Sequence, residues 1–503
     1  MLPPQHPDHH AAADCGFVPP RFGKMNPCPY KTTIFDAEIV SHDVTEVHYC
    51  RTEREEIMQF SGTGTFSHEA KVNIDANLEF IWEPSKLGRK DMLEISATTN
   101  DRALISKYFT LPSFPWSLSG ITKEGFKIVG SGLAIRSSGE SFSEEIELSL
   151  GFRCNYLQFG NENIEFDYID FYLPNIFIAF DEMNKVGKRS TRSTSQISLS
   201  LSDAEYTITL SELNNIVTQK KDILNEGNNL LTVRVTLRKV NGPTFFNEAQ
   251  DLMDHISELI SIGCGGSVGW VQSCAYKDNE RVFNVFRDID FTQLNPFRKL
   301  LPIDLPYCVT EFIKGTVNVY SGLSEHKRKA LKRLRHQIHF SSERLVFPTP
   351  FSTLGSCIED FVQYAIPETD SHYIARADRR KIDPCFAVWV KENIVVLLDE
   401  ADKADFDKTG MKQKLSALLQ RNLRSRISKL LDSYNISYER DWVSDFVKKR
   451  NAAAHGTYTY EKNDYLIWSR MASLLERVLL KELNFKGEFI DWAESPPISK
   501  EFN

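Results

Sequence analysis

The segment Val72–Trp82 reads VNIDANLEFIW, with apolar side chains at every second position. Successive side chains of a strand point to opposite faces of a sheet, so this alternation predicts a β-strand with one buried and one solvated face. Such strands are typical of antiparallel sheets, because the strands of a buried parallel sheet are apolar almost throughout. The same period returns at Ile146–Phe152, Ile197–Leu201 and Leu231–Leu237. We therefore predict an antiparallel, β-sandwich-like domain over residues 31–245.

The period changes after residue 245. Apolar residues from Phe245 to Ile260 recur at i, i+3 and i+4, which predicts an amphipathic helix, and we treat 246–349 as a mixed connecting region. Helical spacing dominates 350–485 and predicts a helical bundle. The apolar segment Phe386–Leu398 fits either a strand or a buried helix. The chain is thus expected to be an α+β multidomain protein.

The two ends of the sequence are expected to be tails. Residues 1–30 contain seven prolines and three histidines with little hydrophobic periodicity, which is typical of a flexible segment. Residues 486–503 are predicted to form a C-terminal tail.

Composition limits the class of protein. The 503 residues suggest about three domains, and 41% hydrophobic with 25% charged residues excludes wholesale disorder. With 60 Lys plus Arg against 68 Asp plus Glu, the formal charge is −8, so any nucleic-acid contact must come from a local basic patch. Nine scattered cysteines without a C-x-x-C pair are typical of reduced thiols, and the apolar runs are short. We expect a cytoplasmic protein without a membrane anchor.

Several local patterns imitate known sites without completing them. The acidic end of Val395–Asp402 resembles a nucleotide-hydrolysing strand, but the chain has no G-x-x-x-x-G-K-[ST] loop. The glycines of 263–269 miss the G-x-G-x-x-G spacing and follow a helix, where a dinucleotide fold requires a strand. His336 and His339 are too few to hold a metal. We therefore expect no cofactor and no metal.

A basic run from His326 to His336 places Leu331, Leu334 and Ile338 on one helical face and cations around the rest. Such a run is either a solvated face or a phosphate-contacting patch. The candidate RNA-binding residues in and around this run are Lys327, Arg328, Lys332, Arg333 and Arg335. A further candidate, Tyr458, lies in the C-terminal bundle.

The sharpest motif is Arg450-Asn-Ala-Ala-Ala-His455, on a helix predicted to begin near Tyr438. At about 100° per residue from Trp442, Arg450 falls at about 80°, inside the apolar stripe of that helix. Asn451 and His455 lie one turn apart at the border of the stripe, and Gly456 is placed to end the helix. Histidine suits proton transfer near neutrality, and the three alanines let a ligand approach.

These residues resemble the HEPN superfamily, whose helical bundles carry an R-x(4–6)-H motif, commonly with a polar residue after the arginine. The resemblance covers 350–485, and the β-rich N-terminal part makes the layout similar to ApeA-type anti-phage proteins. Arg333 to His339 also satisfies the bare pattern. The Asn, the alanines, the glycine and the bundle favour position 450.

The resemblance implies a metal-independent endoribonuclease of antiviral defence, with Arg450, Asn451 and His455 as catalytic residues. The 2′-OH of an RNA, tRNA being one candidate, would attack the adjacent phosphate. His455 would transfer protons, Arg450 would stabilise the phosphate, and Asn451 would orient the phosphate or the histidine. The family also implies a homodimer through the bundle. The β-rich domain would then serve in sensing or binding, and because an always-active ribonuclease would be toxic, we expect it to restrain the bundle until a phage-derived trigger binds.

Two alternatives stay open. Arg450 and His455 could form buried polar contacts within the bundle, or the bundle could bind nucleotides or RNA, or scaffold a complex, without catalysis. Glu359, on the first bundle helix, fits either an assisting group or a surface carboxylate. Tyr458 and Tyr460 follow the motif and could stack on a base.

Overall fold

A computed structural model provides the fold of the chain. It describes residues 58–69, 72–82, 93–100, 114–142, 146–186, 190–201, 204–213, 231–289, 298–343, 345–365, 372–374, 376–397 and 420–502. The predicted tail at 1–30 lies outside these ranges.

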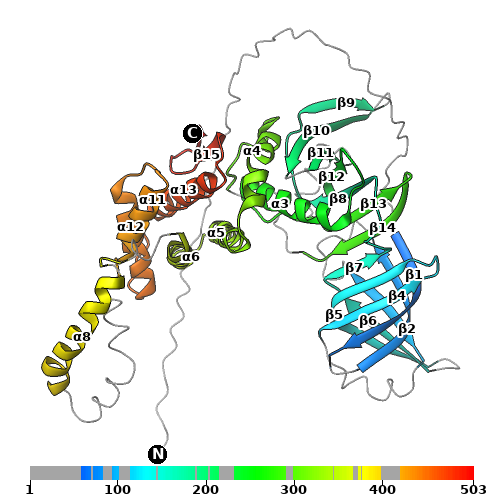
Figure 1. The fold of residues 1–503 in the computed structure, drawn as a ribbon, viewed down its shortest axis with the longest axis horizontal. Helices are drawn as coiled ribbons and strands as arrows, with labels where there is room; N and C mark the ends of the chain where they lie inside the picture. Colours follow the sequence, from blue (N-terminus) through cyan, green and yellow to red (C-terminus); the bar gives the residue numbers. More distant parts are fainter. Residues whose placement is uncertain are drawn as a thin grey trace, which may run out of the picture. The chain divides into compact units, whose positions relative to one another are not determined.

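The N-terminal half is a large antiparallel sheet (Figure 1), which confirms the predicted strand pairing. Within the described ranges its strands are β1 (Met58–His68), β2 (Val72–Trp82), β3 (Glu94–Thr99), β4 (Trp116–Thr122), β5 (Lys127–Phe142), β6 (Ile146–Arg153), β7 (Tyr156–Phe159), β8 (Tyr168–Pro174), β9 (Glu182–Val186), β10 (Ser190–Leu201), β11 (Ala204–Glu212), β12 (Leu231–Lys239), β13 (Gln272–Lys277) and β14 (Glu280–Arg287). Their order is β4-β1-β2-β3-β6-β5-β7-β14-β13-β8-β12-β11-β10-β9.

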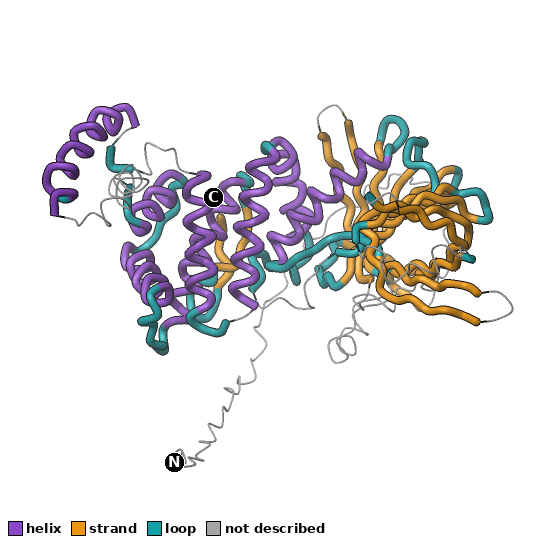
Figure 2. Tube along the Cα trace, turned by 90° about the horizontal axis from the view of Figure 1, so that it is seen from below, coloured by secondary structure: helices purple, strands orange, loops and turns teal. Residues whose placement is uncertain are grey.

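The first strands curl into a closed ring. An additional pairing between β4 and β5 joins the ends of β4-β1-β2-β3-β6-β5, and Figure 2 shows strands (orange) curving round in this way. The segment 72–82 forms β2, whose alternate side chains from Ile74 to Trp82 are buried inside the ring. In the described strands this is one sheet closing on itself, and not the two facing sheets of the predicted sandwich. Alternation fixes which face is buried but not whether the sheet curls.

The second part of the sheet packs against helices. α3 (Phe246–Cys264) contacts β8, and α4 (Cys308–Gly322) contacts β10 (Figure 1). Ile256, Leu259 and Ile260 of α3 are buried in this second core, as their helical spacing predicts. The chain continues directly from this core into the C-terminal helices.

The C-terminal region is helical, so the α+β class is confirmed. Its described helices are α5 (Glu325–Glu343), α6 (Thr349–Ala365), α8 (Arg376–Asn393), the 3₁₀ helix η3 (Val395–Leu397), α11 (Leu423–Ser433), α12 (Arg440–Ala454) and α13 (Asp464–Glu482). Leu331, Leu334 and Ile338 of α5 share a core with α6, α11, α12 and α13. The bundle therefore includes α5, which lies before the predicted boundary at 350. None of the helices in the described ranges has the length and apolar character required to span a membrane.

Two segments differ from their sequence-based expectation. Residues 386–398 lie largely in α8 and η3, where Val388, Trp389 and Leu397 are exposed and not buried. Most of the predicted tail at 486–503 forms a hairpin of β15 (Gly487–Asp491) and β16 (Ile498–Phe502). Phe489 and Phe502 pack into the same core as α3 and α4, a long-range contact that local periodicity does not report.

Candidate functional site

The motif Arg450–His455 lies at the C-terminal end of α12. Val443 and Phe446 are buried and fix the helix in the bundle core. His455 is the C-cap residue: its backbone N–H donates to the carbonyl of Asn451 at 3.0 Å. Gly456 follows with a φ of 69°, a left-handed conformation that glycine adopts without strain, so the helix ends where the sequence predicts. The side chains of Asn451 and His455 are exposed to solvent.

Arg450 combines a packed stem with a partly exposed guanidinium. Its side chain is 23% exposed, and Nη2 donates to Oε1 of Glu359 at 2.7 Å. Nη1 donates to Oδ1 of Asn451 at 3.2 Å. The expectation of Arg450 in the middle of the buried stripe therefore holds for the stem but not for the charged end, which reaches the surface as long cationic side chains commonly do. Lys449 is the buried cation of α12, at 7% exposure.

Gly355 of α6 makes room for the stem of Arg450. A Cβ at Gly355 would lie 2.6 Å from Cγ of Arg450 and 3.2 Å from its Nε. This distance is shorter than real Cβ contacts, so a side chain at position 355 would displace the Arg450 side chain. Our sequence reasoning missed Gly355. Its signal was a glycine inside an amphipathic helix, one turn before Glu359.

Arg426 of α11 is the second arginine near Glu359. It is 8% exposed, and α11 packs against both α6 and α12. Burial lowers the pKa of Arg426, while the Glu359 carboxylate raises it and Arg450 lowers it. Arg421, Arg424 and Lys429 are the basic residues near Arg426 in the sequence, and of these Arg424 and Lys429 are exposed.

The site thus gathers a carboxylate, two guanidiniums, an amide and an imidazole from three helices. Guanidiniums bind phosphate oxygens through charge-assisted hydrogen bonds, and an exposed histidine can exchange protons with a bound ligand. No pocket is required for a polymer substrate to reach His455, because the imidazole is at the surface.

Tyr458 is tied to a structural network beside the motif. Its hydroxyl hydrogen-bonds the Asp464 carboxylate, and its ring lies 6.1 Å from that of Phe351. Lys449 Nζ forms an ion pair with Oδ1 of Asp464 at 2.9 Å. The hydroxyl of Tyr458 is therefore engaged within the protein, whereas Tyr460 is 69% exposed.

The candidate RNA-binding residues of α5 are dispersed and mostly paired. Lys327 forms an ion pair with Glu482, and Arg328 donates to the carbonyl oxygens of Ser321 and Leu323 at the end of α4. Lys332 and Arg333 are exposed, each 3.9 Å from a carboxylate. Arg335 is buried, and its Nε donates to Glu258 at 2.8 Å. Lys332 and Arg333 are thus the members of this set best placed to meet a ligand.

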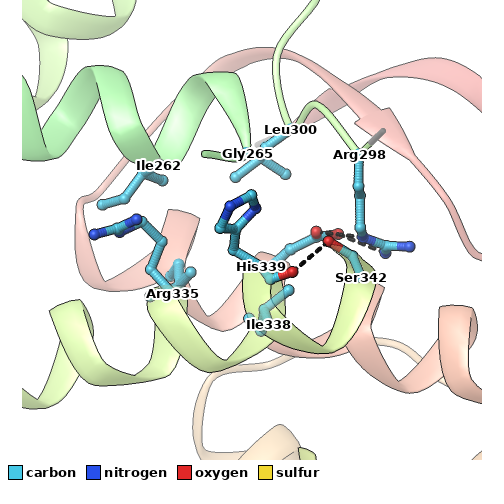
Figure 3. Close-up of a pocket in the computed structure, with 10 residues that line it drawn as sticks. Ile262, Gly265, Arg298, Leu300, Arg335, Ile338, His339 and Ser342 are labelled. Carbon is cyan, nitrogen blue, oxygen red and sulfur yellow. Dashed lines mark hydrogen bonds and ion pairs between the residues drawn. The ribbon is translucent and has the colours of Figure 1, made fainter. Parts of the chain in front are cut away.

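Arg333 and His339, which also satisfy the R-x(4–6)-H pattern, do not form a common site. The Arg333 side chain is 69% exposed, whereas His339 is 7% exposed. Figure 3 shows His339 and Arg335 rising from α5 into a small cavity of about 20 Å³ that Arg298 also lines. Arg333 therefore lies at the surface while His339 lies in the protein interior, and the two side chains do not share a surface. Of the two patterns, Arg450–His455 is the one that the fold presents at the surface.

The cavity lies between two buried ion pairs that join the helical region to the preceding chain. Arg298 donates to Glu476 of α13 at 2.6 and 2.8 Å and to the hydroxyls of Ser469 and Ser473. Arg335 pairs with Glu258 of α3. Burial raises the pKa of Glu476, and Arg298 opposes that effect.

Comparison with known proteins gives a match for one part of the chain. Residues 161–297 match the family model described as YopA central domain. This stretch contains β8 to β14 and α3, and it leaves the motif on α12 outside. No curated protein and no solved structure matches the chain.

Proposed function

We propose that the chain is a HEPN-type, metal-independent endoribonuclease, with an ApeA-like role in anti-phage defence. The observation that carries the proposal is the exposed His455 at the end of α12, one turn after Asn451, which accepts a hydrogen bond from Arg450 while Glu359 holds the guanidinium of Arg450. A purely structural motif would bury these groups among bundle contacts, and His455 is not buried.

The proposed reaction is transesterification within RNA. The 2′-oxygen attacks the adjacent phosphorus and forms a new P–O bond, the bond to the 5′-oxygen breaks, and a 2′,3′-cyclic phosphate and a 5′-hydroxyl result. His455 transfers a proton from the 2′-OH or to the leaving oxygen. Arg450 stabilises the charge on the phosphorane, and Asn451 orients Arg450.

A homodimer fits this chemistry. The reaction requires one proton removal and one proton donation, and one copy of the motif provides a single histidine. Two motifs related by a two-fold axis would provide both groups. The measurement is light scattering coupled to size exclusion, together with activity. A strictly monomeric protein that cleaves RNA contradicts this assembly.

The β-rich region is proposed to restrain the nuclease until a phage-derived ligand binds, since unrestrained cleavage of cellular RNA, tRNA included, would be toxic. Cells expressing the full chain should grow normally without infection and stop growing on infection. Arrest without infection contradicts restraint.

The test of activity is incubation of the purified full chain with total RNA in EDTA. Cleavage that leaves cyclic phosphate ends supports the proposal. Arg450→Lys should cleave poorly, because an ammonium cannot reproduce the two-point contact of a guanidinium. Binding of RNA without cleavage, under any trigger, favours the alternative of a non-catalytic RNA-binding or scaffolding protein.

A further inference from the structure

Arg426 is a buried cation that the proposed reaction does not use. It is 8% exposed, in the first turns of α11, a helix that packs against both α6 and α12. Its Nε lies beneath the surface without a hydrogen-bond partner in the part of the chain that the structure describes. A buried guanidinium atom without a partner is costly, so its retention requires a reason.

The neighbouring charges do not neutralise Arg426. Glu359 is the carboxylate that acts on both arginines, and its Oε1 already accepts a hydrogen bond from Arg450 at 2.7 Å. The next carboxylate of α6, Asp360, is 63% exposed and lies 3.9 Å from Arg333. Two guanidiniums therefore share one carboxylate, and the cluster keeps a net positive charge.

The two arginines differ in mobility. Arg426 is buried, at 8% exposure, whereas Arg450 is 23% exposed and held by a hydrogen bond to Glu359 that an incoming anion could replace. A buried guanidinium beside one that can change its partner is suited to bind an oxyanion with several acceptor oxygens. Phosphate has this chemistry.

We propose that Arg426 and Arg450 together form a two-guanidinium site for a phosphate group. Arg426 binds the phosphate from the bundle side, and Arg450 turns from Glu359 to close on it. The inference rests on the proposed function for its natural ligand, the RNA backbone, while the anion site can be tested without cleavage.

The first experiment measures the melting temperature of the full chain with inorganic phosphate against chloride at equal ionic strength. Wild type should gain several degrees in phosphate, and so should Arg424→Met, a matched control exposed on the same helix. Arg426→Met should lose the gain. No phosphate-specific gain in wild type, or an equal gain in Arg426→Met, overturns the inference.

Arg426→Met also distinguishes a role of Arg426 in phosphate binding from a role in folding. Methionine is apolar and of similar length, so Arg426→Met without phosphate should melt at or above the temperature of wild type. A fall of several degrees, or failure to fold, would show that Arg426 is structural and would overturn the inference. Arg426→Lys keeps the charge and should still show a much smaller gain in phosphate than wild type.

The second experiment uses RNA. Binding of a fully 2′-O-methylated RNA, which cannot be cleaved by this chemistry, should weaken on the order of 10-fold in Arg426→Met and remain unchanged in Arg424→Met. Cleavage of ordinary RNA by Arg426→Met at the wild-type rate would contradict the two-guanidinium site but would still agree with the proposed function. A wild type that never cleaves RNA, yet shows the phosphate effect, removes the proposed function and leaves the anion site.

Discussion

His455 contributes to α12 through its backbone, while its imidazole lies in solvent. We therefore expect His455→Ala to leave the melting temperature within about 1–2 °C of wild type, because exposed substitutions change the stability little. Cleavage of RNA should fall by about 10²- to 10⁴-fold, as is usual when a general acid or base is lost. Initial cleavage rates and thermal melts of the same preparations measure both effects.

The control is His336→Ala, which removes an exposed histidine from α5. It should retain wild-type cleavage. Full activity in His455→Ala, or equal loss in both variants, would contradict the proposed role of His455.

Gly355 offers a more selective test, because it touches Arg450 and carries no functional group. In Gly355→Ala the new methyl would lie 2.6 Å from Cγ of Arg450, so the Arg450 side chain must move. Displacements of about 1 Å at a reacting group cost up to about 100-fold in rate, so we expect cleavage to fall on the order of 10- to 100-fold. The melting temperature should change little, because alanine gains about 1 kcal/mol of helix propensity that offsets the strain.

Gly315→Ala provides a matched comparison. Gly315 lies inside α4, and no atom of the described chain is within 4 Å of the place that the new methyl would take. The substitution should raise the stability by about 0.5–1 kcal/mol and leave cleavage unchanged. Wild-type cleavage in Gly355→Ala would show that the position of Arg450 does not limit the reaction.

At the scale of elements, α12 is joined to the start of α13 by a buried ion pair. Lys449 is 2.9 Å from Asp464, which is fully buried and also accepts from Tyr458 and from the backbone of Glu461. Burial raises the pKa of Asp464, but the hydrogen bonds from Lys449 and Tyr458 outweigh it, and the net pKa is lowered. The pair should therefore hold the end of α12, and with it the motif, in place.

Lys449→Met should lower the free energy of unfolding by about 3 kcal/mol near neutral pH, because it leaves a buried carboxylate without its cation. A carboxyl whose pKa is lowered by folding stabilises the protein above its unfolded pKa, near 4, and this contribution disappears as the pH falls through the folded pKa. The difference between wild type and variant should therefore be large at pH 7 and shrink below about pH 4. Denaturant melts across this range measure it, and a difference that is constant with pH would contradict the argument.

At the scale of the whole described chain, Arg298 ties the segment before α4 to α13 through Glu476 and two serines. Arg298→Met alone should destabilise the protein by about 3–5 kcal/mol, because Glu476 would remain buried without its partner. Arg298→Met combined with Glu476→Leu should recover most of that loss, since an apolar pair of similar volume avoids the cost of burying charge. Calorimetry of the two single variants and the double variant tests this, and additive losses would contradict the pairing.

The sequence alone predicted the elements that depend on local periodicity. The alternation in 72–82 predicted β2 and its buried face, and the helical spacing after residue 350 predicted the bundle. The position of Gly456 predicted the end of α12, because a left-handed residue after a helix is a local requirement. Arg450, Asn451 and His455 could likewise be selected from their spacing and their neighbours.

Contacts between distant residues were decided only by the tertiary structure. Closure of the strand ring depends on the pairing of β4 with β5, and the placement of β15 and β16 depends on a core shared with α3 and α4. The same holds for the site: Gly355 and Glu359 lie next to Arg450, and the charge of Arg450 acts on Arg426, because α6, α11 and α12 pack together. Periodicity reports which face of an element is buried but not which partner covers it, so these neighbours could not be read from the chain.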